Sequence, residues 1–91
     1  MFWAYNAGRD PLKMLDELAD RIILVHLKDG LAAKRFSGPK SKILGQGGAG
    51  IADIVAKLKD RNVRMIVESE GAQSGCMNDV RACIDYLKSL D

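Results

Sequence analysis

Residues 22–29 read IILVHLKD, a short apolar run that ends in polar and charged residues. Its first four residues are branched and uncharged, which is typical of a strand buried on both faces of a parallel sheet. We therefore expect a strand from Ile22 to His26, with Lys28 and Asp29 just beyond its carboxyl end. A sheet of this kind needs helices to cover it.

A helix is predicted before this strand. Asp10 is followed by Pro11, which places a capping side chain next to the residue best suited to the first helical position. Apolar residues then recur with a helical period, at Pro11, Leu12, Met14, Leu15, Leu18 and Ala19.

The alternation of helix and strand continues after residue 29. A second apolar stripe consists of Ile51, Ile54, Val55 and Leu58, and a second buried strand is predicted from Val63 to Glu68. A final helix, with Asn78 as its cap, carries a stripe of Val80, Cys83, Ile84, Leu87 and Leu90. This order predicts an α/β fold with parallel strands and right-handed crossovers.

Composition limits the chain to one unit, residues 1–91. With 47% hydrophobic and 29% charged residues it can bury a core, and its net charge of +2 gives no argument for nucleic acid. No apolar run is long enough to span a membrane, and residues 1–6 do not resemble a secretory signal. We expect a cytoplasmic protein whose two cysteines are reduced thiols.

The predicted sheet is too small to be complete. Two strands, or three if Met1 to Ala4 is another, leave apolar sheet edges unsatisfied. An eight-stranded α/β barrel needs about 250 residues, so the chain would supply its last quarter to three eighths. Exposed sheet edges also predict a homo-oligomer.

Two polar side chains end the two predicted strands. His26 and Glu68 would project from neighbouring carboxyl ends, where α/β proteins bind ligands. An imidazole and a carboxylate are groups that a divalent cation accepts, so the pair suggests half of a metal site. The alternative is a hydrogen-bonded core histidine and a solvated glutamate.

A glycine-rich segment lies between the strands. Residues 45–50, GQGGAG, match the spacing GxGxxG of a dinucleotide-binding turn. No buried strand is predicted before it, which favours a flexible active-site loop, although its amides could still hold an anion. The segment from Lys28 to Lys42 is basic, so it either meets an anion or is simply solvated.

Several of these motifs together resemble a known family. The residues GRDP (8–11), ADRI (19–22) and VHLKD (25–29) are similar to the G-x-DP, ADRI and VHLKD signature of sugar phosphate isomerases and epimerases. LGQG (44–47) is similar to the LGEG of that family, and IVE (66–68) to its VVE. These enzymes are xylose-isomerase-like TIM barrels, and the resemblance extends over nearly the whole chain.

The resemblance implies a fold, a reaction and a set of roles. The chain would be the last three β/α units of a (β/α)8 barrel, in the order β-α-β-α-β-α. His26 and Glu68 would bind manganese, cobalt, magnesium or zinc, and Glu68 would also transfer a proton next to a carbonyl through an enediolate. Trp3, Lys28 and Asp29 would contact a sugar or sugar phosphate.

Other residues depart from the family pattern. Gln46 stands where the family has a glutamate, and Gly50 where it has an aspartate. The second active-site carboxylate belongs to an earlier strand, so the chain alone is expected to be inactive. The related DNA repair enzymes need an Asp-x-His pair that residues 31–44 lack. The open alternative is a non-catalytic module that binds an anion or nucleotide through Gly45 to Gly50.

Overall fold

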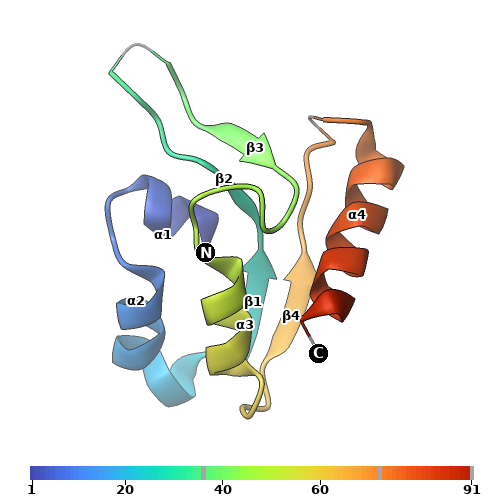
Figure 1. Ribbon diagram of the computed structural model, residues 1–91. Helices are drawn as coiled ribbons and strands as arrows, with labels where there is room; N and C mark the ends of the chain where they lie inside the picture. The colour runs from blue at the N-terminus through green and yellow to red at the C-terminus, as the bar shows by residue number, and fades with distance from the viewer. Residues whose placement is uncertain (36, 72, 91) are drawn as a thin grey trace.

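The computed structural model describes residues 1–35, 37–71 and 73–90 (Figure 1). Its elements are α1 (Phe2–Asn6), α2 (Pro11–Leu18), the 3-10 helix η1 (Ala19–Arg21), β1 (Leu24–Leu27), β2 (Asp29–Leu31), β3 (Lys40–Lys42), α3 (Ile51–Leu58), β4 (Arg64–Val67) and α4 (Cys76–Ser89). The chain is therefore a mixed α/β structure.

Strands β1 and β4 form a two-stranded parallel sheet. The register pairs Val25 with Met65 and His26 with Ile66. A hydrogen bond of 2.9 Å from the amide of Glu68 to the carbonyl of Leu27 continues the ladder past the end of β4. The predicted parallel order of these two strands is confirmed.

One face of this sheet forms the core. Val25 and Leu27 alternate with exposed residues along β1 and point toward the helices. The fully or nearly fully buried apolar side chains are Leu15, Val25, Leu27, Leu44, Ala49, Ile51, Ile54, Leu58 and Cys83. They come from α2, β1, α3, α4 and the loop before α3, so helices cover this face of the sheet (Figure 1).

The helices that were predicted from apolar stripes begin close to their predicted positions. Pro11 opens α2, and the amide of Leu12 donates 2.9 Å to the Asp10 carboxylate, as a cap requires. Pro11 and Leu15 are buried, whereas the side chain of Ala19 lies outside the described part of the structure. The α3 stripe buries Ile51, Ile54 and Leu58 as expected.

The predicted strand from Met1 to Ala4 is wrong, because this segment is helix α1. A helical turn brings the rings of Phe2 and Tyr5 to the same side, with centroids 6.2 Å apart. Phe2 is 1% exposed and its ring meets the edge of the Trp3 ring at 5.1 Å. Aromatic burial therefore decides the conformation here, and the expected β-α-β-α-β-α order lacks its first strand.

The hairpin of β2 and β3 was not predicted. The two strands are antiparallel, with Asp29 opposite Lys42 and Leu31 opposite Lys40, and the hairpin extends away from the body of the molecule (Figure 1). Its strands, DGL and KSK, show no alternation of apolar and polar residues from which a strand could be predicted. The basic segment therefore contains two paired strands, one near its beginning and one at its end.

Helix α4 begins at Cys76, so Asn78 is not its cap. Asp79 reaches back instead, and its carboxylate accepts hydrogen bonds from the Ser74 hydroxyl at 2.6 Å and from the amides of Gln73 and Ser74. These bonds, the one from the Ser74 hydroxyl first, lower the pKa of Asp79. At 14 residues α4 is the longest helix, and within residues 1–35, 37–71 and 73–90 no helix has the length and apolar character to cross a bilayer.

Candidate functional site

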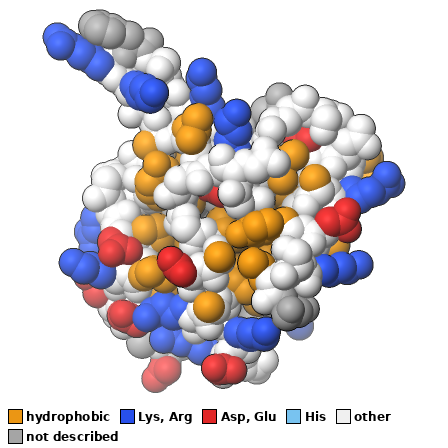
Figure 2. All heavy atoms as spheres, viewed as in Figure 1, with side chains coloured by type: hydrophobic (Ala, Val, Ile, Leu, Met, Phe, Trp, Pro, Cys, Tyr) orange, Lys and Arg blue, Asp and Glu red, His pale blue; other side chains and the backbone are white. Residues whose placement is uncertain are grey.

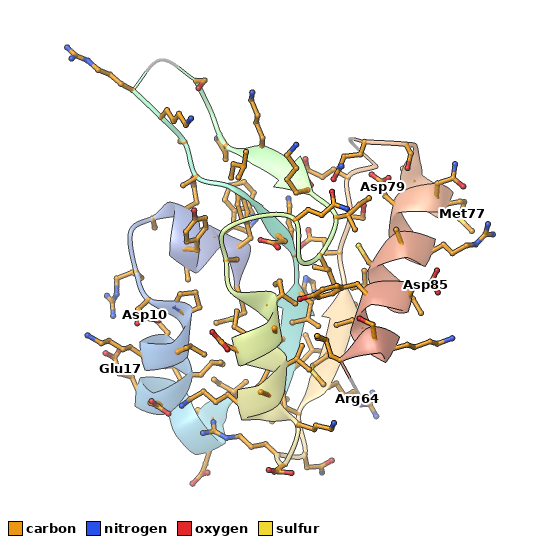
Figure 3. The ribbon with its side chains drawn as sticks, viewed as in Figure 1. Asp10, Glu17, Arg64, Met77, Asp79 and Asp85 are labelled. Carbon is orange, nitrogen blue, oxygen red and sulfur yellow. The ribbon has the colours of Figure 1, made fainter. Side chains whose placement is uncertain are left out.

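The face of the parallel sheet away from the helices carries polar groups between exposed apolar ones. We call it the open face, and it consists of Leu24, His26, Ile66 and Glu68. Leu24 and Ile66 are 42% and 43% exposed, although both are large and apolar. Arg64 begins the same row at the amino end of β4, far from the hairpin (Figure 3). The candidate site occupies the opposite, carboxyl end.

His26 and Glu68 lie together on the open face. His26 pairs with Ile66, so Glu68 stands one pleat further along the same face of the neighbouring strand. The distance from His26 Nδ1 to Glu68 Oε2 is 3.7 Å, and both side chains are about half exposed. The parallel register thus brings the two predicted ligands to one point.

The amino terminus also reaches this point. The Met1 amine donates a 3.1 Å hydrogen bond to the carbonyl of His26. Partial burial lowers the pKa of this amine, and the negative charge of Glu68 opposes that shift by raising it. The N-terminal amine is therefore part of the electrostatic surroundings of Glu68.

Lys28 and Glu70 form a second polar pair one pleat beyond His26 and Glu68. Lys28 is only 3% exposed, and its Nζ donates to Glu70 Oε1. The same Nζ lies 4.8 Å from the Trp3 ring centroid and 5.7 Å from that of Phe2, within cation–π range. Lys28 is thus a fixed cation and not a solvated one, and Trp3 offers a half-exposed ring beside it.

Asp29 points to the other side of the chain and meets the glycine-rich loop. Its Oδ1 accepts from the amides of Gly30 and Ala49, and its Oδ2 from those of Gly45 and Gly47, all at 2.9 to 3.0 Å. The side chain is buried, with 1% exposure. The contact of Asp29 with substrate stays a prediction, and in this structure the carboxylate holds the glycine-rich loop.

The glycine-rich loop uses its amides within the chain. Besides the three donors to Asp29, the amide of Gln46 donates to Ile43 and that of Gly48 to Gly30. A Cβ on Gly47 would lie 2.4 Å from Asp29 Oδ1, so close packing explains this glycine without a phosphate. The predicted flexible loop is in fact tied down at five consecutive amides.

The structure also bears on the resemblance of this loop to a dinucleotide-binding turn. A strand does precede it, namely β3, which the sequence did not indicate. That strand pairs antiparallel with β2 and lies outside the parallel sheet. The strand–turn–helix unit of a dinucleotide site requires a strand of the parallel sheet, and the loop lacks this setting.

The His26–Glu68 pair fits the donor set of a divalent metal in part. Two donors bound to one ion at about 2.1 Å each lie roughly 3.0 to 3.4 Å apart, so the observed 3.7 Å needs a shift of a few tenths of an ångström. In the part of the chain that the structure describes, no group of three His, Cys, Asp or Glu side chains could hold a metal. This chain can therefore contribute two donors.

One member of the site escaped the sequence analysis. Glu70 is not among the predicted site residues, yet it pairs with Lys28 on the same side as Glu68. Its spacing of two residues from Glu68 is the signal that places both on one face of extended chain.

Comparisons of this chain with family models, curated proteins and solved structures found no match.

Proposed function

We propose that this chain supplies the carboxyl-terminal part of a metal-dependent sugar or sugar phosphate isomerase or epimerase, built as the end of a (β/α)8 barrel in the cytoplasm. The observation that carries this proposal is the position of His26 and Glu68. They stand on one open face, at the carboxyl ends of adjacent parallel strands, 3.7 Å apart. Ligand sites of α/β sheets and barrels lie at this end of the strands.

The two side chains have separate roles in the proposed reaction. His26 and Glu68 would hold manganese, cobalt, magnesium or zinc, which polarises substrate oxygens and stabilises negative charge that develops on them. Glu68 removes the proton from the carbon next to a carbonyl and returns it at the product carbon. Its half-exposed carboxylate is open to a substrate.

The neighbouring residues support substrate binding on the same face. The Trp3 ring is 54% exposed and gives an apolar surface on which the C–H side of a sugar can lie. Lys28 is only 3% exposed and pairs with Glu70, so it would contribute to the site through its cation–π contact with the Trp3 ring. The chain alone is expected to be inactive, because it provides two metal donors and one of the two carboxylates that the reaction uses.

The competing proposal is a binding module without catalysis that holds an anion or nucleotide through residues 45–50. Such a module needs loop amides that are free to donate to the ligand. Five of these amides already donate within the chain, three of them to Asp29. The metal-dependent function is therefore the better supported of the two.

Calorimetric titration of the 91-residue chain with Mn²⁺, Co²⁺ and Zn²⁺ tests the proposal. We expect weak binding, because two protein donors leave most coordination positions to water. His26→Ala and Glu68→Gln should each lower the affinity by about tenfold or more. Glu17→Gln makes the same chemical change at an exposed carboxylate of α2, away from the open face, and is the control, with unchanged affinity.

Two results would count against the proposed function. Equal metal affinity of the chain and its His26→Ala variant would remove His26 from the site. An equal loss of metal affinity in Glu17→Gln and Glu68→Gln would show that binding depends only on the overall charge of the chain.

A further inference from the structure

A cavity of about 390 Å³ lies beyond the Lys28–Glu70 pair. Its lining consists of Pro39, Lys40, Ser41, Lys42, Glu70 and Gln73. Glu70 belongs both to this cavity and to the ion pair with Lys28, so the cavity directly adjoins the row of polar groups on the open face. We call it the β3 cavity.

The charge of the β3 cavity favours an anion. Lys40 and Lys42 line it, and within the described residues neither of them forms an ion pair or a side-chain hydrogen bond. Glu70 is the one carboxylate in the lining, and Lys28 already pairs with it. The three lysines and one glutamate leave two positive charges, which matches a phosphate monoester near neutral pH.

The backbone around the cavity is held in place. Lys42 lies opposite Asp29 in the hairpin, and Asp29 is itself fixed by four amides. Across the cavity, the Gln73 side chain accepts from the Ile43 amide at 2.6 Å and donates to Gln46 Oε1 at 3.0 Å. The two walls are thus joined, and the lysines project from an ordered strand. Figure 2 shows Lys and Arg side chains gathered at the hairpin, whereas the lower part of the molecule mixes both signs.

We propose that the β3 cavity binds the phosphate group of a phosphorylated sugar whose reactive carbon lies at His26 and Glu68. Lys40 and Lys42, which are two residues apart in β3 and therefore share one face of the strand, would neutralise the phosphate. The cavity is close enough to that site, because Glu70 lines it and follows Glu68 by two residues, or about 6 to 7 Å of extended backbone. That the ligand is a sugar rests on the proposed function, whereas phosphate binding by the cavity does not.

The test is a titration of the metal-free 91-residue chain with inorganic phosphate, fructose 6-phosphate and fructose, followed by calorimetry and amide chemical shifts. We expect the two phosphates to bind, to shift the amides of residues 40–43 and 73, and fructose to do neither. The double variant Lys40→Ser/Lys42→Ser should lose about tenfold or more in phosphate affinity. The matched control Lys13→Ser/Lys34→Ser makes the same change in net charge, from +2 to 0, with lysines outside this cavity.

The outcomes separate the two proposals. Loss of phosphate binding in the β3 variant but not in the control supports the cavity, and binding that persists in His26→Ala supports it even if metal titrations fail. Equal losses in both double variants would show attraction to net charge only and would overturn the proposal. The absence of any phosphate-induced shift in the unmodified chain would also overturn it.

Discussion

Asp29 accepts two backbone hydrogen bonds on each of its carboxylate oxygens and is 1% exposed. An asparagine would offer a single oxygen and turn its N–H groups toward backbone donors. Because buried donors without acceptors are costly, we expect Asp29→Asn to lower the free energy of unfolding by roughly 2 to 4 kcal/mol. Urea denaturation followed by circular dichroism measures the change.

The control for this variant is Asp53→Asn, which makes the same chemical change at an exposed position in the first turn of α3. Its expected cost is less than about 1 kcal/mol, from the helix dipole alone. Similar costs in the two variants would show that the Asp29 hydrogen bonds contribute little net stability.

Asp79 makes the stability of the chain depend on acid pH. Its hydrogen bonds lower the pKa in the folded state, so its contribution to stability is present above the unfolded value of 3.8 and is lost as the pH falls through the lower folded value. We therefore expect the difference in unfolding free energy between the chain and Asp79→Asn to shrink below about pH 4. Denaturation series at pH 7, 5, 4 and 3 measure it, and a constant difference would contradict the assignment.

Sequence and structure agree on the positions of some residues and differ on those of others for a physical reason. The pairing of His26 with Glu68 follows from two strand ends and a parallel register, which periodicity can indicate. Asp29 is different, because its partners lie 16 to 20 residues away in a loop, and no local pattern reports such contacts. Lys28 likewise depends on distant aromatic rings and on Glu70.

At the scale of elements, the apolar patterns predicted the helices and strands whose positions depend on packing against the core. The α2 and α3 stripes bury apolar side chains as expected. The two parallel strands lie within one or two residues of their predicted bounds, but the prediction that they are buried on both faces is wrong, because β1 buries only Val25 and Leu27 and no residue of β4 is fully buried. The helix at residues 2–6 and the β2–β3 hairpin did not follow from pattern. Aromatic contacts select the first, and backbone pairing with few apolar residues selects the second.

The turn from β3 into α3 depends on a glycine at position 45. Gly45 has a φ of 89°, and a Cβ there would lie 2.4 Å from the Tyr86 ring. We expect Gly45→Ala to cost roughly 2 to 4 kcal/mol, because backbone strain and displacement of the ring add together. Chemical denaturation of the purified variant gives this value.

Gly50→Ala separates the two causes. Gly50 also has a positive φ, 76°, but a Cβ there meets nothing within 4 Å. Gly50→Ala should therefore lower the free energy of unfolding only by the backbone strain, about 1 to 2 kcal/mol. In a Tyr86→Ala background Gly45→Ala should cost no more than Gly50→Ala, and a cost that Tyr86→Ala leaves unchanged would argue against the ring contact.

At the scale of the whole molecule, the open face predicts self-association. Leu24, Ile66 and Trp3 expose large apolar surface on it or beside it, and Ile23 is 77% exposed next to β1. Burying such side chains contributes roughly 1.5 to 3 kcal/mol each, and β1 and β4 pair only with each other in the described sheet. We expect a concentration-dependent dimer or larger assembly by size-exclusion chromatography with light scattering.

Charged substitutions identify the surface involved. Leu24→Lys/Ile66→Lys should shift the equilibrium toward the monomer, because inward charges oppose pairing of apolar faces. Ala52→Lys/Met77→Lys adds the same two charges at exposed positions of α3 and α4 and should leave association unchanged. A strictly monomeric chain at high concentration would contradict the expectation.

The Asp29 carboxylate has a further consequence for the motion of the chain. Loop amides usually exchange their hydrogens with solvent quickly, but those of Gly45, Gly47 and Ala49 can do so only when the carboxylate lets go. We therefore expect the amides of residues 45–49 to exchange about as slowly as those of the core, although these residues form neither helix nor strand. If the proposed site takes up a ligand, any motion that admits it would then come from the outer hairpin, because the glycines at residues 45–50, whose composition suggests a hinge, are held in place.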